Sequence, residues 1–206
     1  MKPRCRHFSD CGGCSLQDKE YSKQVEEKKK ILETFPDIEE AGFISSPEIY
    51  AFRNKMEFSF EGENLGLHRR GRFDEVINLT ECPVFAGWAG EFLQKVREFA
   101  SRYNLPYCRR RDNSGLLRFL ILRESKFTGE NMAVLVVNAP DFKYKKEWAE
   151  VVKKYMPGKS SALIGYKTSL GDSAFTENYE TAGGSGKIKV KIGDIPLELS
   201  PYSFFQ

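Results

Sequence analysis

Four of the five cysteines in the chain follow a spacing that is typical of proteins holding an iron–sulfur cluster. Cys5, Cys11 and Cys14 lie close together, and Cys82, followed directly by Pro83, comes much later. Four thiolates also suit a structural zinc ion, so that alternative stays open. Disulfide bonds are a weaker interpretation, because an odd number of cysteines leaves one thiol over and no apolar leader precedes the cluster. The pattern therefore predicts a metal centre that joins two distant parts of the chain.

The composition excludes some classes of protein. With 206 residues, the chain has enough material for one large domain or two small ones. It contains no run of about 18 apolar residues, so we expect no membrane span. Metal-binding thiolates fit a reducing compartment, so we expect a cytoplasmic protein. The net charge of +3 does not by itself predict a nucleic-acid partner, and the distribution of charge is more informative.

Basic residues gather in three clusters, Lys28–Lys30, Arg69–Arg72 and Arg109–Arg111. The lysine cluster falls within a predicted helix, where a solvent-exposed face is the simpler interpretation. The two arginine clusters fall in predicted turns or loops, with Phe73 and Tyr107 close to them in the sequence. Arginine and aromatic side chains on one surface suit RNA phosphates and unstacked bases. The arginine clusters therefore predict contact with RNA.

The periodicity of apolar residues predicts a mixed α+β fold. Residues 1–50 are expected to form the cysteine loop and an amphipathic helix over 18–35, with Tyr21, Val25, Leu32 and Phe35 on its apolar face. Residues 51–199 are expected to form a β-rich central domain. Its predicted helices cover 86–103 and 145–155, and its predicted strands cover 52–60, 65–69, 75–79, 116–124, 132–138, 161–166, 188–192 and 195–199.

Two of these predicted segments bear on function, the strand meander before Cys82 and the glycine-rich stretch 181–186. The first three strands form a meander that returns Cys82 to the N-terminal cysteines. The glycine-rich stretch 181–186 is expected to be a flexible loop, because it lacks the Lys-Ser/Thr ending of a phosphate-binding loop and opens no helix. Residues 200–206 would begin a further domain.

The chain resembles the RNA uracil-5-methyltransferases, which make 5-methyluridine in tRNA or rRNA. Five segments carry the resemblance, in the order found in that family. They are Cys5–Gln17, Phe52–Phe58, Leu65–His68 with Cys82 and Pro83, Leu117–Arg123 with Thr128–Glu130, and Leu199–Gln206.

The resemblance implies a [4Fe–4S] cluster on the four grouped cysteines and a central region that grips RNA. It also implies that Gln206 contacts S-adenosyl-L-methionine and the reacting centre, and that Phe204 lines a pocket for the flipped uracil. In the family, a Rossmann-like catalytic domain with the nucleophilic cysteine and the general base follows this point. We therefore expect that domain to be missing after residue 206, no catalytic residue within the chain, and no activity from this segment alone.

The candidates for RNA contact are the basic side chains of these segments and of the first arginine cluster. They are Arg53, Lys55, His68, Arg69, Arg70, Arg72, Arg118 and Arg123. His7, inside the cysteine loop, is either a group beside the metal or a solvated side chain. Cys108 is the spare thiol. Its arginine neighbours would lower its pKa, but its local sequence does not match the family's catalytic cysteine, and a buried or loop thiol is the simpler interpretation.

An alternative function is a free-standing iron–sulfur or zinc RNA-binding module without catalysis. The apolar ending Phe204-Phe205-Gln206 favours a part of an enzyme over such a module. The identity of the RNA, the target uridine and the oligomeric state do not follow from the sequence.

Overall fold

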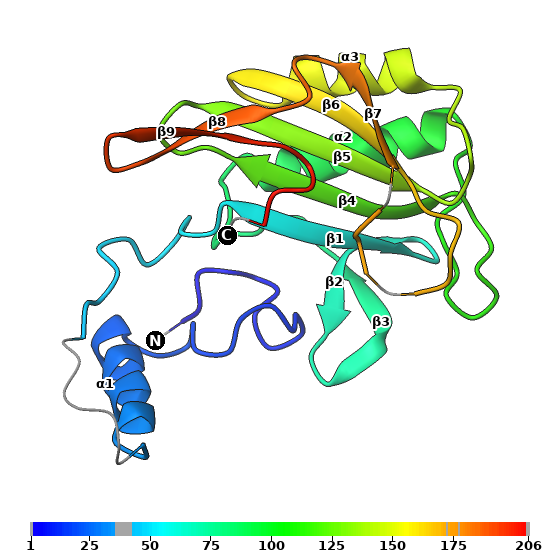
Figure 1. The fold of residues 1–206 in the computed structure, drawn as a ribbon. Helices are drawn as coiled ribbons and strands as arrows, with labels where there is room; N and C mark the ends of the chain where they lie inside the picture. The colour runs from blue at the N-terminus through cyan, green and yellow to red at the C-terminus, as the bar shows by residue number, and fades with distance from the viewer. Residues whose placement is uncertain (1, 36–42, 172, 177, 205–206) are drawn as a thin grey trace.

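The computed structural model describes residues 2–35, 43–171, 173–176 and 178–204, and its centre is a seven-stranded sheet (Figure 1). The strands are β1 (Lys55–Glu61), β2 (Asn64–Arg69), β3 (Arg72–Asn78), β4 (Leu117–Glu124), β5 (Glu130–Val137), β6 (Lys159–Tyr166) and β7 (Asn178–Gly183). They lie in the order β3-β2-β1-β4-β5-β6-β7. Among the described strands, β5 and β6 are the one parallel pair. A mostly antiparallel sheet with helices on one face agrees with the predicted α+β class.

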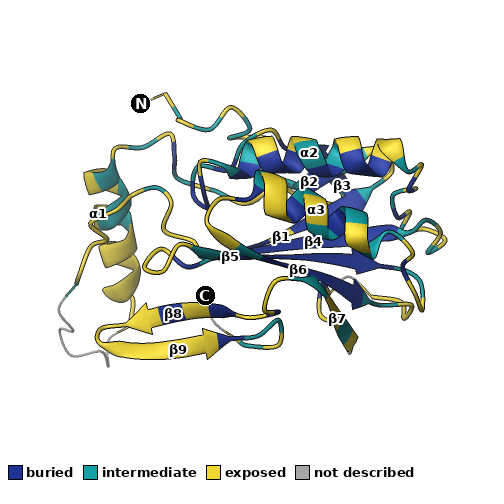
Figure 2. Ribbon diagram, turned by 90° about the horizontal axis from the view of Figure 1, so that it is seen from above, coloured by how far each residue is buried: buried dark blue, intermediate teal, exposed yellow. Residues whose placement is uncertain are grey.

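Two helices, α2 (Ala89–Arg102) and α3 (Lys145–Tyr155), cover one face of the sheet (Figure 2). Both are amphipathic, and each turns its apolar stripe toward the strands. Trp148 of α3 is fully buried, and its ring centre lies 6.2 Å from that of Phe92 and 5.7 Å from that of Phe99, both on α2. This aromatic cluster joins the two helices over the sheet.

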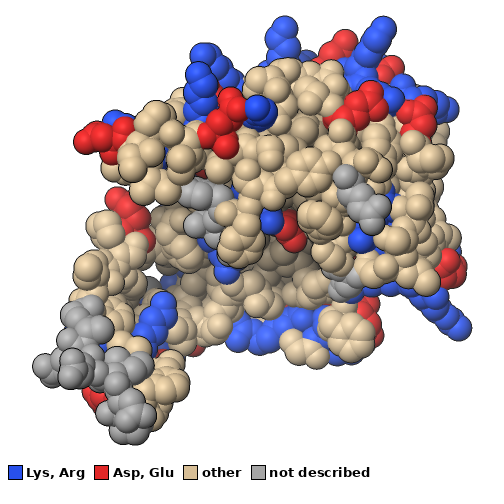
Figure 3. Space-filling view, viewed as in Figure 1, with Lys and Arg blue, Asp and Glu red and all other residues tan. Residues whose placement is uncertain are grey.

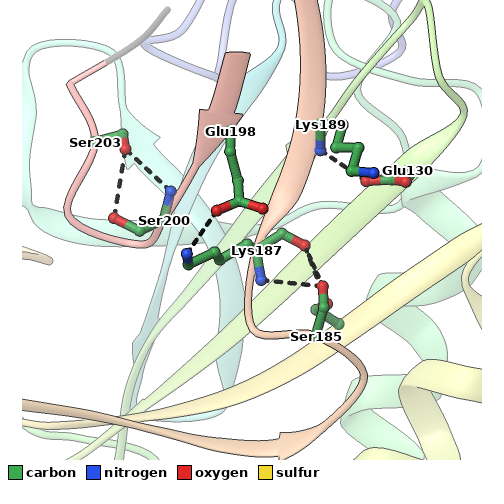
Figure 4. Close-up of polar contacts among 8 residues, drawn as sticks. Glu130, Ser185, Lys187, Lys189, Glu198, Ser200 and Ser203 are labelled. Carbon is green, nitrogen blue, oxygen red and sulfur yellow. Dashed lines mark hydrogen bonds and ion pairs between the residues drawn. The ribbon is translucent and has the colours of Figure 1, made fainter. Parts of the chain in front are cut away.

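A second core on the opposite face buries the central strands on both sides. It is closed by a hairpin of β8 (Ile188–Ile192) and β9 (Ile195–Leu199). The N–H of Lys189 donates to a carboxylate oxygen of Glu130 at 2.6 Å (Figure 4), and the hydroxyl of Thr128 donates to the carbonyl of Lys189, also at 2.6 Å. These bonds hold the hairpin to the turn between β4 and β5. Burial on both faces explains why β4 and β5 are continuous apolar runs.

The N-terminal helix α1 (Tyr21–Leu32) lies apart from this core (Figure 1, Figure 2). The predicted apolar face is not covered by any described element: no residue of α1 is buried, and Leu32 and Phe35 are 41% and 53% exposed. The predicted helix is therefore present with shorter bounds, and its apolar side chains are partly buried at most. Pro36, the residue that follows the predicted helix, lies outside the described residues.

Most predicted elements are present with shifted ends, and α3, β8 and β9 have the predicted bounds. The clearest difference is β7, because its last residues were expected to be a loop. β7 is a mostly exposed strand that pairs antiparallel with β6, with Thr181 opposite Leu163. Its polar sequence carries no period-2 apolar pattern, so the exposed backbone edge of β6 determines the strand.

The segment that carries Cys82 is held against the start of α2. The N–H groups of Phe85 and Ala86 both donate to the carbonyl of Cys82, at 3.0 and 3.3 Å. Gly90 of α2 packs directly on the backbone of Thr80, so that a Cβ atom at Gly90 would lie 2.0 Å from the Thr80 carbonyl oxygen. The absence of a side chain at Gly90 therefore sets how closely this segment approaches the helix.

We predict that Gly90→Ala lowers the free energy of unfolding by about 1–3 kcal/mol, because either α2 or the Thr80 backbone must move. Gly87→Ala is the matched control, since a Cβ at Gly87 meets no atom within 4 Å, and we expect a change below about 0.5 kcal/mol. Urea unfolding monitored by tryptophan fluorescence measures both. Equal stability of the two variants would contradict this view of the packing.

Candidate functional site

The four grouped cysteines line one small cavity between the N-terminal loop and the segment after β3. Cys11 and Cys82 are buried, and Cys5 and Cys14 are half-buried. The meander of β1, β2 and β3 therefore returns Cys82 to the first three cysteines, as predicted. Leu79 and Val84 are among the apolar residues that close the cavity, so the thiols face a largely dry space.

Hydrogen bonds between backbone groups fix the cysteine loop on β2. The N–H of Gly12 donates to the carbonyl of His68 at 2.9 Å, and the N–H of Arg70 donates to the carbonyl of Asp10 at 2.7 Å. The guanidinium of Arg70 donates to the carbonyl of Cys14 and lies 5.3 Å from the ring centre of Phe8. The turn between β2 and β3 therefore contacts the cysteine loop and holds it in place.

His7 joins the same loop to the segment that carries Cys82. Its Nε2 accepts a hydrogen bond from the N–H of Thr80 at 3.0 Å and lies 2.9 Å from the Thr80 hydroxyl oxygen. The N–H of Arg6 donates to a carboxylate oxygen of Glu81 at 2.6 Å. Burial lowers the pKa of His7, which favours the neutral imidazole that accepts these bonds. His7 thus has a structural role that its position in the sequence did not reveal.

The electrostatics of the cavity disfavour free thiolates. Burial, and then the neighbouring thiols of Cys14, Cys11 and Cys5, raise the pKa of Cys82 to about 12. Burial also raises the pKa of Cys5 and of Cys11. A cation at the centre would reverse this preference, because a coordinated thiol is deprotonated.

Four thiols around one cavity are a donor set that fits iron–sulfur or zinc. Within the described ranges, however, no group of three or more His, Cys, Asp or Glu side chains has the spacing of a metal site. The metal centre therefore stays a prediction.

Next to the cysteine loop, a groove of about 730 Å³ runs along the start of β1. Its lining includes Gly12 and Gly13 of the loop, together with Phe52, Arg53 and Lys55. Phe52 is 56% exposed and Arg53 is exposed, whereas Lys55 is partly buried. The lining thus combines an accessible aromatic ring with positive charge, which is the composition that single-stranded RNA prefers.

The structure brings most of the predicted RNA-binding residues to this end of the molecule. His68 also lines the groove. Arg69 pairs with Asp10 at 3.2 Å and with Glu75 at 2.7 Å. Arg72 pairs with Asp74 at the start of β3, and Figure 3 shows Lys and Arg side chains along the lower edge of the molecule.

Arg118 and Arg123 differ from the other predicted RNA contacts, because they are 6% and 3% exposed. Arg118 donates to the carbonyls of Lys167, Ser169 and Gly171 at 3.1, 2.6 and 2.8 Å. Arg123 donates to the carbonyl of Ser203 at 2.6 Å. Both lie on β4, which is buried on both faces. This burial gives both side chains a structural role, and their contact with RNA stays a prediction.

The spare thiol of Cys108 is buried, at 4% exposure, which confirms the simpler interpretation. Burial raises its pKa and outweighs the opposite effect of Arg118 and Arg110. The neighbouring arginines therefore do not activate this thiol. Phe204 is 94% exposed, and Gln206 lies outside the described residues.

No family model matches the chain, but individual proteins do. It is 32% identical over 206 residues to the 23S rRNA (uracil(747)-C(5))-methyltransferase of Pyrococcus furiosus, in a match that covers 100% of this chain and 48% of that protein. It is 30% identical over 207 residues to the tRNA (uracil(54)-C(5))-methyltransferase of Pyrococcus abyssi, with 99% of this chain and 48% of that protein covered. The chain thus spans about half the length of the curated relatives it matches.

The structure resembles the crystal structure of the Pyrococcus abyssi tRNA (uracil-54, C5)-methyltransferase in complex with S-adenosyl-L-homocysteine. The TM-score is 0.79 at 27% sequence identity, and the match covers 95% of this chain and 46% of that chain. The described sheet and helices therefore occur within a methyltransferase structure. This match does not confirm the expectation that a Rossmann-like catalytic domain is missing after residue 206. No helix in the described ranges is long and apolar enough to cross a membrane.

Proposed function

We propose that the chain is part of an S-adenosyl-L-methionine-dependent RNA uracil-5-methyltransferase, because its homologues over its full length are RNA uracil-5-methyltransferases. That similarity is the observation on which the proposal depends. The relatives named above act on tRNA or on 23S rRNA, so the substrate proposed here is an RNA that contains the target uridine. Within the enzyme, residues 51–199 grip the RNA, and residues 1–50 carry the cysteine loop.

The proposed RNA surface is the groove beside the cysteine loop. Arg53 and Lys55 provide positive charge for phosphates, and Phe52 provides a ring on which a base can stack. Arg70 and Arg72 extend this surface over the turn between β2 and β3. Arg118 and Arg123 are left out of the RNA surface because they are buried.

We predict that the double variant Arg53→Ala/Lys55→Ala binds RNA more weakly and with a smaller dependence on salt. The slope of log K against log[salt] should fall by about 1.5, at roughly 0.7–0.9 for each lost phosphate contact. Fluorescence anisotropy with a labelled tRNA transcript and an rRNA fragment, over a salt series, measures this slope. Lys146→Ala/Lys153→Ala, two exposed positions on α3, is the control that removes the same charge. If the slope of log K against log[salt] falls equally in both double variants, the groove assignment is wrong.

The proposed second cofactor is a [4Fe–4S] cluster on Cys5, Cys11 and Cys14 of the N-terminal loop and on Cys82 of the segment after β3. Its support is the four thiols around one cavity and their position between two segments that are distant in the sequence. When bound, the cluster would cross-link the N-terminal loop to the segment between β3 and α2. Methyl transfer to uracil needs no electron transfer, so we assign the cluster a structural role.

We predict that replacing any one of the four cysteines with serine removes most of the iron and the absorbance near 400 nm from anaerobically purified protein. Cys108→Ser is the matched control and should keep both, because the Cys108 thiol lies outside the cavity. Iron and acid-labile sulfide assays, with zinc measured in parallel, decide the identity of the metal. Zinc in wild-type protein, with little iron, would overturn the iron–sulfur assignment.

The chemistry of the reaction limits what this chain contributes. Carbon 5 of uracil becomes nucleophilic when a thiolate adds to carbon 6, and a base must then remove the proton from carbon 5. Four of the five cysteines are assigned to the cavity, and Cys108 is buried with a raised pKa. We therefore place the nucleophile outside this chain's cysteines. As the resemblance implies, Phe204 is proposed to line the uracil pocket and Gln206 to contact the cofactor and the reacting centre; Phe204 is solvent-exposed in this chain.

We predict that the 206-residue chain alone binds RNA but transfers no methyl group to it. The assay follows tritium from labelled S-adenosyl-L-methionine into tRNA and rRNA transcripts, with an active relative such as the Pyrococcus abyssi enzyme as the positive control. If the chain transfers methyl groups and still does so as Cys108→Ser, the reaction needs neither Cys108 nor a thiol from outside this chain. Transfer that disappears in Cys108→Ser would make that cysteine the nucleophile.

A further inference from the structure

A second hollow, which we call the β1-end pocket, lies at the opposite end of β1 from the groove. Its volume is about 600 Å³, within the usual range for small-ligand sites. It is lined by Ser59, Phe73, Arg110, Arg111, Arg118 and Leu170. These residues come from β1, β3, β4 and two loops, so the pocket is formed by tertiary packing and has no signature in the sequence.

The rim of the β1-end pocket carries two exposed apolar side chains. Phe73 and Leu170 are each 80% exposed and approach the pocket from different elements, β3 and the segment after β6. Large apolar side chains that stand on either side of a hollow expose surface that a flat ligand would cover. An aromatic ring in this position is the usual platform for a nucleobase.

Arg110 is held in place at the wall of this pocket. Its Nε lies 3.4 Å from a carboxylate oxygen of Glu61, and its Nη1 donates to the carbonyl of Phe73 at 2.8 Å. Its Nη2 lies 2.7 Å from Nε2 of His68, which lines the groove. Arg110 therefore connects the β1-end pocket to the groove, and the exposed Arg111 adds positive charge beside it.

Arg118 forms another part of the wall and carries an unused donor. Its two terminal nitrogens hold the carbonyls of residues 167–171, which places Leu170 at the rim. Its Nε is buried, and among the described residues it has no hydrogen-bond partner. Because the Nε is itself buried, Arg118 contributes to the pocket by fixing the 167–171 segment and does not offer this donor to a ligand.

We propose that the β1-end pocket binds an unstacked nucleobase of the RNA, at a site separate from the uracil that is methylated. A base has an apolar face for Phe73 and Leu170. The connected backbone has phosphates for Arg111. The link from Arg110 to His68 joins a wall of the pocket to a wall of the proposed RNA groove, which favours RNA over a free aromatic metabolite. The inference rests on the proposed RNA-binding function.

The test compares Phe73→Ala with Phe127→Ala, an equally exposed phenylalanine (77%) in the turn between β4 and β5. Both variants should fold like wild type, because both rings are solvent-exposed, and thermal unfolding checks this. RNA affinity is measured with labelled tRNA and rRNA transcripts over a salt series. RNA containing 5-iodouridine is also photo-crosslinked to the chain, and the linked peptides are identified by mass spectrometry.

We expect Phe73→Ala to weaken RNA binding roughly 5- to 100-fold, the usual effect of losing one stacked base, without changing the salt slope. Phe127→Ala should bind like wild type, and a crosslink should map to the peptide with Phe73. Unchanged affinity of Phe73→Ala, or crosslinks confined to the groove, would overturn the inference while the groove variant still tests the proposed function. Absence of RNA binding by the wild-type chain would overturn both this inference and the proposed RNA-binding function.

Discussion

The arrangement of the site depends on the contacts that dock residues 5–14 onto the sheet. Backbone bonds from Gly12 to His68 and from Arg70 to Asp10 hold one side of the loop, and His7 holds the other side at Thr80. Without them, three thiols would belong to a mobile terminus and the fourth to the core. With them, the four thiols share one cavity, at the cost of raised thiol pKa values. The raised pKa values and the docking contacts together are what the proposed metal centre would need, because a bound cation would offset the cost of ionising the buried thiols.

The same strand that stabilises the core also supplies the binding surface. Along β1, Met56, Phe58 and Phe60 are buried in the core beneath α2 and α3. Because side chains alternate along a strand, Lys55 and its i+2 neighbours face the other way. The groove lies at the beginning of this polar face and the β1-end pocket at its end. A rigid central strand therefore sets the spacing between the two proposed RNA contacts.

Local patterns explain which parts of the structure were predictable. The helix α3 and the hairpin of β8 and β9 were placed correctly, because each has a clear period and the hairpin has a Gly193-Asp194 turn. The gathering of Cys82 with the other cysteines was predictable because a meander reverses direction at each turn. β7 was missed because its partner strand, not its own sequence, makes it a strand.

The roles of the arginine residues also could not be predicted from local sequence patterns. Arginine was taken as a surface residue, yet Arg118 and Arg123 are buried where the protein offers backbone carbonyls as acceptors. Residue type alone cannot distinguish an arginine that binds phosphate from one that binds its own backbone, because both need the same donors. The apolar run around them on β4 was the available indication of burial. Arg118 shows this clearly, since its two terminal nitrogens donate to three backbone carbonyls, while its buried Nε has no acceptor among the described residues. The role of an arginine thus depends on which acceptors the fold places around its donors, and that placement follows from tertiary packing.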